Sequence, residues 1–258
     1  MKKKIDTCLN CKNKIDLSFI DLGKTPIANN LSSNKSKLKV YDLHAKVCGK
    51  CYLVQVNPGA IPSKLYNEYS YQSGHSSTWR NHCNIIARKI KKNKVSSSSK
   101  ILEVASNDGT QLELLKKNKF TNIYGVDPSK NLCSKVNKMG FRVFPEFFGK
   151  KFASKFLRKY GAAKVVIANN VIAHIPNIND FCEGLSIVLD DNGFCLIEFH
   201  YLLNLIKEKA FDTIYHEHHF YHSLSTINKI LKKNNLKIHD FENIKTHGGS
   251  MRIYVSKI

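Results

Sequence analysis

The stretch Ile101-Leu102-Glu103-Val104-Ala105-Ser106-Asn107-Asp108-Gly109-Thr110 decides the fold class of this 258-residue chain. It starts as a short apolar strand, turns through small and polar residues, and opens a helix that reaches to about Asn118. Small residues at such a turn let the backbone approach a ligand at the helix start. The sequence therefore predicts the first strand, turn and helix of an α/β domain here.

Short apolar segments alternate with helical ones after this stretch. Further strands are predicted at 122–126, 141–144, 164–168 and 193–199, and helices at 129–139, 148–159 and 179–189. Such alternation predicts a parallel sheet with right-handed crossovers. Two extended segments follow, 236–244 and 251–255, with nothing helical between them, which predicts an antiparallel hairpin. A Rossmann-like parallel sheet closed by such a hairpin resembles the class I methyltransferase fold.

Two Cys-x-x-Cys pairs near the N-terminus predict a metal site. They are Cys8-Leu9-Asn10-Cys11 and Cys48-Gly49-Lys50-Cys51. Two such turns supply four thiolates, the soft ligands that favour tetrahedral zinc, and a filled shell of four indicates a structural role. The alternatives are two unrelated pairs of buried cysteines, or a redox pair. The other four cysteines are isolated in apolar surroundings and are expected in the core: Cys83, Cys133, Cys182 and Cys195.

Lysine supplies almost all of the positive charge behind the formal net charge of +21. Nucleic-acid readers usually rely on arginine for bidentate contacts, so the composition argues against nucleic acid and is compatible with an anionic small substrate such as a nucleotide sugar. No apolar run approaches the ~20 residues of a membrane-spanning helix. The N-terminus, Met1-Lys2-Lys3-Lys4, has no apolar stretch behind it, so we expect a cytoplasmic protein without a membrane partner.

The turn after the first predicted strand indicates which cofactor the domain takes. It lacks a complete GxGxxG pattern and a P-loop lysine, so a phosphate cradle is poorly supported. Asp127, followed by Pro128, ends the next predicted strand about twenty residues on, where a carboxylate can bind the two ribose hydroxyls of an adenosine. These features favour S-adenosylmethionine, which is cationic at sulfur and carries no phosphate. A dinucleotide, or no cofactor, remains the alternative from these residues alone.

Several longer blocks make the sequence specific. Besides the cysteine pairs they are Asp21-Leu22-Gly23-Lys24-Thr25-Pro26-Ile27-Ala28-Asn29, Tyr69-Ser70-Tyr71, Ser76, Trp79 and the 103–109 turn. Three more are uncommon in other methyltransferases: Ala168-Asn169-Asn170-Val171-Ile172-Ala173-His174-Ile175-Pro176, Phe211-Asp212-Thr213-Ile214-Tyr215-His216-Glu217-His218 and Thr246-His247-Gly248-Gly249-Ser250-Met251-Arg252. With these blocks the chain resembles the C-methyltransferases that act on nucleotide-linked 4-keto-deoxysugars.

The resemblance implies roles for individual residues. A carbon beside a ketone becomes nucleophilic only after losing a proton, and the resemblance gives the general base as His218. Tyr215 would hydrogen-bond the substrate or enolate, and Glu217 would bind or orient it. The sugar pocket would be lined by Tyr69, Tyr71, Asn170, His174 and His247. The cofactor would be held by Glu103, Ser106, Asn107, Asp108, Gly109, Asp127, Pro128, Ala168 and Asn169. His219 and His222 have no matched role and are expected at the surface or in packing.

The predicted organisation is a zinc-binding domain over 1–60, a helical connector over 61–98 and a methyltransferase domain over 99–258. The helical pattern of the connector runs from Ile61 to Lys92, and serines at 96–99 indicate an exposed loop behind it. Family members usually continue with a C-terminal domain, so a separately encoded one is an expected partner. The leading hypothesis is C-methylation of a nucleotide-linked 4-keto-deoxysugar. The alternatives are an O- or N-methyltransferase on the same scaffold, or an inactive truncated remnant of the family.

Overall fold

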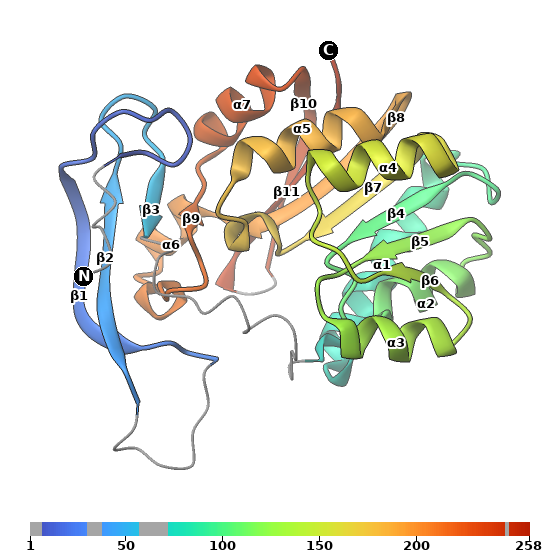
Figure 1. Ribbon diagram of the computed structural model, residues 1–258, viewed down its shortest axis with the longest axis horizontal. Coiled ribbons are helices and arrows are strands. Elements are labelled where there is room, and N and C mark those ends of the chain that lie inside the picture. Colours follow the sequence, from blue (N-terminus) through green and yellow to red (C-terminus); the bar gives the residue numbers. More distant parts are fainter. Residues whose placement is uncertain (1–6, 30–37, 57–71, 246–247) are drawn as a thin grey trace.

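Two β-sheets organise the protein, one large and covered by helices, the other small and at the N-terminal end (Figure 1). The computed structural model describes residues 7–29, 38–56, 72–245 and 248–258. Within these ranges no helix is long and apolar enough to cross a lipid bilayer.

The large sheet has seven strands in the order β10-β11-β8-β7-β4-β5-β6. They are β4 (Ile101–Val104), β5 (Ile123–Val126), β6 (Arg142–Phe144), β7 (Ala163–Asn169), β8 (Leu189–His200), β10 (Leu236–Ile244) and β11 (Ser250–Lys257). Strands β4 to β8 pair in parallel, whereas β11 pairs antiparallel with both β8 and β10. The predicted Rossmann-like parallel sheet and its closing antiparallel hairpin are therefore confirmed.

Helices cover both faces of this sheet (Figure 1). Packed against one face are α1 (Ser77–Lys92), α2 (Thr110–Lys117) and α3 (Lys130–Lys138), and against the other α4 (Lys150–Tyr160), α5 (Ile178–Val188) and α7 (Leu224–Lys233). Strand β4 is buried along its whole length, as expected for a parallel strand between two helical layers. The four isolated cysteines are all buried, which confirms their predicted place in the core.

Helix α1 starts later than its apolar pattern predicts. Residue Gln72 is extended, and Ser73–His75 form the short 3-10 helix η4, so the predicted helix is wrong over 72–76. The α-helix begins at Ser77 because the hydroxyl of Ser76 accepts the backbone N–H of Trp79 as an N-cap. The earlier part of the predicted helix, 61–71, lies outside the described residues.

The small sheet has the order β1-β2-β3-β9. Its strands are β1 (Leu17–Pro26), β2 (Val40–Val47), β3 (Val54–Val56) and β9 (Phe220–Tyr221). The last strand comes from the C-terminal half of the chain and pairs with β3, Val54 opposite Tyr221 and Gln55 opposite Phe220. The core of the small sheet also includes Leu202 and Leu205 from the short helix α6 (Leu202–Lys207). The cysteine-bearing sheet and the large domain are therefore built partly from the same segment.

Candidate functional site

Four cysteine sulfurs converge at the end of the small sheet. The Sγ atoms of Cys8 and Cys51 are 3.6 Å apart, those of Cys11 and Cys48 are 3.5 Å apart, and all four lie within 4.8 Å of one another. A tetrahedral zinc site with Zn–S bonds of about 2.3 Å has sulfur–sulfur edges of about 3.8 Å. Four thiolates this close repel one another, so a bound cation is what would hold them together. Donor type, number and spacing therefore fit zinc.

The two cysteine turns have the same backbone geometry. In each, the residue after the second cysteine is left-handed, with φ of 63° at Lys12 and 61° at Tyr52. In each, the N–H of the first cysteine donates across the turn, from Cys8 to the carbonyl of Asn13 and from Cys48 to that of Leu53. This equivalence supports a shared metal and argues against two unrelated buried pairs.

The loop after β4 is held in an unusual conformation. Ala105, Asn107 and Gly109 have φ of 57°, 47° and 80°, all in the left-handed region. A side chain on Gly109 would also collide with Val136, whose Cγ1 would lie 2.7 Å from an added Cβ. Left-handed non-glycine residues cost of order 1–3 kcal/mol each and cluster at ligand sites. The loop thus has the character of a binding loop.

Asp127 ties this loop to the next helix. One carboxylate oxygen accepts the N–H of Asn107 at 2.9 Å and the other accepts the N–H of Ser129 at 2.8 Å. The side chain is buried at the carboxyl end of the parallel strands, as predicted for a ribose-binding residue. Pro128, partly buried, follows it directly.

Buried polar atoms without a hydrogen-bond partner in the described chain gather beside the loop. They include Glu103 Oε2, Ser106 Oγ and both amide atoms of Asn169. Burial, together with the charges of Asp108 and Asp127, raises the pKa of Glu103. Buried polar groups are almost always satisfied, so these atoms indicate a place for a polar ligand. A cofactor with an amino group, hydroxyls and a cationic centre fits them.

Other predicted cofactor residues contact the protein itself. Asn107 Oδ1 accepts the N–H of Ser73 at 3.1 Å, and Asp108 Oδ2 accepts the N–H of Gly74 at 2.7 Å. The side chain of Ala168 packs in the core on the α5 face of the sheet, so only its backbone can face the cofactor loop. The contacts from Ser73 and Gly74 were not predicted, because no local pattern marks a loop that closes over another.

Three histidine rings and a tyrosine meet beyond the ends of β7 and β8. The ring of His218 lies 4.7 Å from that of His174 and 5.1 Å from that of His200, between ring centroids. His218 Nδ1 donates to the carbonyl of Thr213 at 2.9 Å, so in the neutral ring the free lone pair is on Nε2. The Tyr215 hydroxyl lies 2.7 Å from that Nε2 and donates to it. His200 was not predicted; it directly follows the strand predicted at 193–199 and ends the observed β8.

His218 and His174 are held neutral. Burial, with the neighbouring His174 and His200, lowers the pKa of His218 well below its usual value. Burial, with His200, lowers the pKa of His174 to about 4. The lone pair on Nε2 of His218 is therefore available at neutral pH, and the same lowered pKa makes this imidazole a weaker base than an exposed histidine.

The small sheet supports the segment that carries His218. Glu217 Oε1 accepts both the backbone N–H and the side-chain amide of Asn29, each at 3.0 Å. The N–H of Val56 donates to the carbonyl of His219 at 3.0 Å. Asn170, with φ of 51°, lies after β7 and donates its N–H to the carbonyl of Glu198. The structure therefore brings Tyr215, Glu217 and His218 together with residues from both sheets.

Some predicted residues do not fall in this cluster. Tyr69, Tyr71 and His247 lie outside the described residues. His219 and His222 are buried, with 2% and 1% of their surface exposed, so the expectation of packing holds and that of a surface position is wrong. The reason for His222 is aromatic packing, its ring lying 5.5 Å from that of Phe199.

Comparison with known proteins now decides the family. Residues 79–240, more than half of the chain, match the methyltransferase domain family Methyltransf_23, and residues 8–66 match the zinc-binding domain family Methyltransf_13. The chain belongs to the methyltransferase domain family. It carries an S-adenosylmethionine-dependent methyltransferase domain and an N-terminal zinc-binding domain, which confirms the predicted enzyme class and both predicted cofactors.

The methyltransferase is 28% identical over 256 residues to the C-methyltransferase NovU of Streptomyces niveus. The match covers 98% of this chain but 61% of that relative, so the chain spans less than two thirds of the relative's length. Among solved structures, magnesium protoporphyrin IX methyltransferase of Synechocystis PCC 6803 with bound S-adenosylhomocysteine is similar, with a TM-score of 0.54 and 14% identity over 69% of this chain and 83% of that one. The PH0226 protein of Pyrococcus horikoshii OT3 has a TM-score of 0.55 and 15% identity over 77% of this chain and 100% of that one.

Proposed function

We propose that this methyltransferase transfers a methyl group to the carbon beside the ketone of a nucleotide-linked 4-keto-deoxysugar. The observation that carries the proposal is the hydrogen-bonded pair of Tyr215 and neutral His218, with the basic Nε2 facing the tyrosine hydroxyl. The similarity to a C-methyltransferase and the resemblance of the sequence blocks to sugar C-methyltransferases support carbon as the acceptor.

In this proposal His218 Nε2 removes the proton from the acceptor carbon. The resulting imidazolium keeps its Nδ1–H bond to the Thr213 carbonyl, which stabilises the positive charge. The Tyr215 hydroxyl, released from Nε2, donates to the enolate oxygen. Glu217, fixed by Asn29, orients the substrate from the side of the small sheet.

S-adenosylmethionine supplies an electrophilic methyl carbon on a sulfonium. When bound, it would supply this methyl to the enolate carbon, and S-adenosylhomocysteine would leave with the electrons of the methyl–sulfur bond. The proton stays on His218 until solvent removes it. Among the residues of this chain, Asp127 would bind the ribose, while Glu103 and Asn169 would face the amino-acid end. The strained loop from Ala105 to Gly109 would shape the pocket.

The test is the variant His218→Asn, assayed for methyl transfer and for exchange of the acceptor's α-proton in deuterated water. Loss of a general base costs about 10²–10⁴-fold in rate, so both transfer and exchange should fall by that factor. Binding of S-adenosylhomocysteine should persist, which verifies the fold. The exposed His239 offers the matched control His239→Asn, which should behave as wild type.

Unchanged proton exchange in His218→Asn would refute the base assignment and direct attention to His174. Methyl transfer onto a hydroxyl, without α-proton exchange in the wild type, would instead support an O-methyltransferase. Transfer to a nucleotide-linked 4-keto-deoxysugar by the wild type is the positive result that supports the substrate class.

A further inference from the structure

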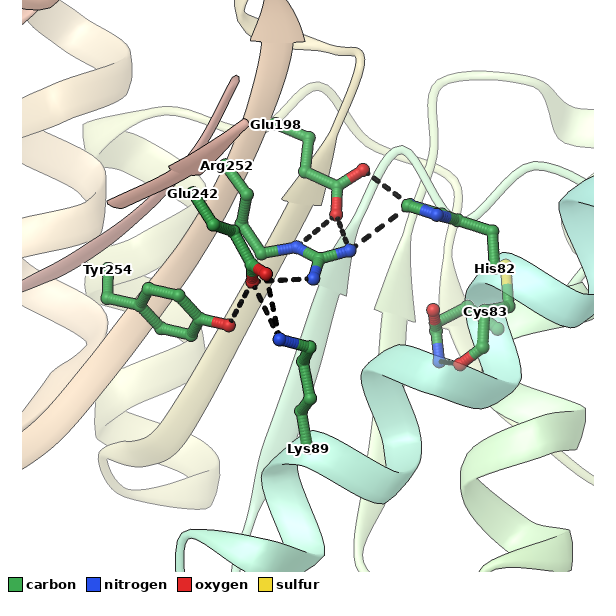
Figure 2. Close-up of polar contacts among 8 residues, drawn as sticks. His82, Cys83, Lys89, Glu198, Glu242, Arg252 and Tyr254 are labelled. Atoms are coloured by element: carbon green, nitrogen blue, oxygen red, sulfur yellow. Dashed lines mark hydrogen bonds and ion pairs between the residues drawn. The ribbon is translucent and has the colours of Figure 1, made fainter. Parts of the chain in front are cut away.

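A buried cluster of charged side chains lies on the α1 face of the large sheet, outside the chemistry described above. Figure 2 shows Glu198 of β8 between His82 of α1 and Arg252 of β11. Glu198 Oε2 lies 2.7 Å from His82 Nε2, and Glu198 Oε1 accepts from Arg252 Nε at 2.5 Å. His82, Glu198 and Arg252 are 4%, 1% and 2% exposed. The carboxylate therefore joins three separate elements in the interior.

Two further side chains, Glu242 and Lys89, extend the cluster. Arg252 Nη1 also donates to Glu242 Oε1 at 2.8 Å, and Glu242 receives Lys89 Nζ at 2.8 Å (Figure 2). Two carboxylates thus face two permanent cations. His82 Nε2 donates to Glu198, since the carboxylate can only accept. His82 therefore fixes the direction in which the Glu198 carboxylate points.

On one side, His82 is linked to the cofactor loop through helix α1. Its ring stacks on Trp79, one turn earlier, with centroids 5.3 Å apart and planes at 24°. In η4, just before the start of α1, the backbone N–H groups of Ser73 and Gly74 donate to the side chains of Asn107 and Asp108. A shift of α1 along the sheet would pull on these contacts.

On the other side, Glu198 is linked to the ends of the central strands. Its carbonyl accepts the N–H of Asn170, the left-handed residue after β7. Two residues further along β8, the ring of His200 lies 5.1 Å from the ring of His218. Glu198 is therefore connected both to the ends of the central strands and, through His82, to helix α1.

Buried charge networks often add little net stability compared with apolar packing, and in some proteins they specify the geometry of the elements that they join. We propose that His82 is a positioning residue for the methyl donor. Its hydrogen bond to Glu198 sets α1 in register on the sheet, and thereby holds Ser73 and Gly74, which precede the helix, at the cofactor loop. This inference rests on binding of the methyl donor and not on the proposed sugar acceptor.

The test is calorimetric titration with S-adenosylhomocysteine, which needs no acceptor and so separates this proposal from the proposed function. His82→Phe keeps an aromatic ring beside Trp79 but cannot donate to Glu198, and should weaken binding by roughly 2- to 30-fold, the usual range for residues that act through others. His82→Gln, whose amide can donate, should restore affinity. Cys83→Ala is the matched control, because it loosens the packing of α1 at the adjacent buried position and leaves Glu198 untouched.

The fluorescence of Trp79 gives a second measurement, since Trp79 is the single tryptophan of the chain and its ring stacks on His82. A purely structural role of His82 would not change how this fluorescence responds to ligand. S-adenosylhomocysteine should reduce acrylamide quenching of its fluorescence in the wild type and in Cys83→Ala, and this protection should be lost in His82→Phe. Equal loss of affinity in Cys83→Ala and His82→Phe at matched melting temperatures would overturn the proposal. Wild-type quenching that is unchanged when S-adenosylhomocysteine is added would also overturn the proposal. This result does not depend on whether His82→Phe folds.

Discussion

Removing zinc should release the segment that carries His218 as well as the small sheet. Cys48→Ser takes away one of four ligands, and structural zinc contributes apparent binding energies of about 10–16 kcal/mol, comparable with the whole stability of a domain. Besides the pairing of β3 with β9, the small sheet would then withdraw three hydrogen bonds from the segment, one from Val56 to His219 and two from Asn29 to Glu217. At roughly 1 kcal/mol each, their loss favours local opening of residues 214–222 by about a hundredfold.

The assay is amide hydrogen exchange followed by mass spectrometry, with metal content measured on the same samples. Peptides covering 214–222 should exchange faster in Cys48→Ser and in chelator-treated wild type, while peptides from β4 and β7 keep their protection. Cys182→Ser is the control, because it alters an equally buried thiol in α5 outside the metal cluster. Full protection of 214–222 in protein shown to be free of zinc would refute the coupling between the two sheets.

Three further perturbations have definite expected outcomes. Gly125→Ala should weaken S-adenosylhomocysteine binding, because the new Cβ would lie 2.6 Å from Ser106 Oγ and displace the cofactor loop; unchanged calorimetric affinity would contradict this. Arg252→Met should cost about 3–5 kcal/mol in urea unfolding, because Glu198 loses its buried cation, whereas a loss below about 1 kcal/mol would mean that the pair is dispensable. Burial lowers the pKa of His222 to about 3, so the unfolded chain binds the proton first as pH falls below about 6.5. Stability should therefore decrease from pH 6.5 towards 4, by up to about 1.4 kcal/mol per pH unit for this histidine, and flat thermal midpoints across that range would rule the effect out.

The large sheet could be predicted because each of its parallel strands is an apolar run between two helical layers. β7, for example, is apolar along most of its length and was located within a residue or two at each end. β1 gave no such signal, since most of its residues are exposed or only partly buried and it shows no regular alternation. β9 is only two residues long, and its pairing with β3 depends on tertiary contact.

The candidate site could likewise be predicted only where its residues are contiguous in sequence. The cysteine pairs, Asp127 and the block from Tyr215 to His218 are contiguous in sequence, so their residue types and spacing were informative. The partners that fix them are remote: Asn29 reaches Glu217, and His82 reaches Glu198, across long intervals of chain. No local pattern encodes such a pair, because each depends on how two finished elements pack.

The position of β9 also constrains the order in which the protein can assemble during synthesis. The cysteine turns leave the ribosome early, yet the sheet that carries them stays one strand short until residues 220–221 have followed. Until then β3 presents an open edge to any other nascent or aggregating strand. A fragment of residues 1–60 expressed alone would keep that edge permanently, and a short peptide with the sequence of β9 supplied with it should improve its solubility.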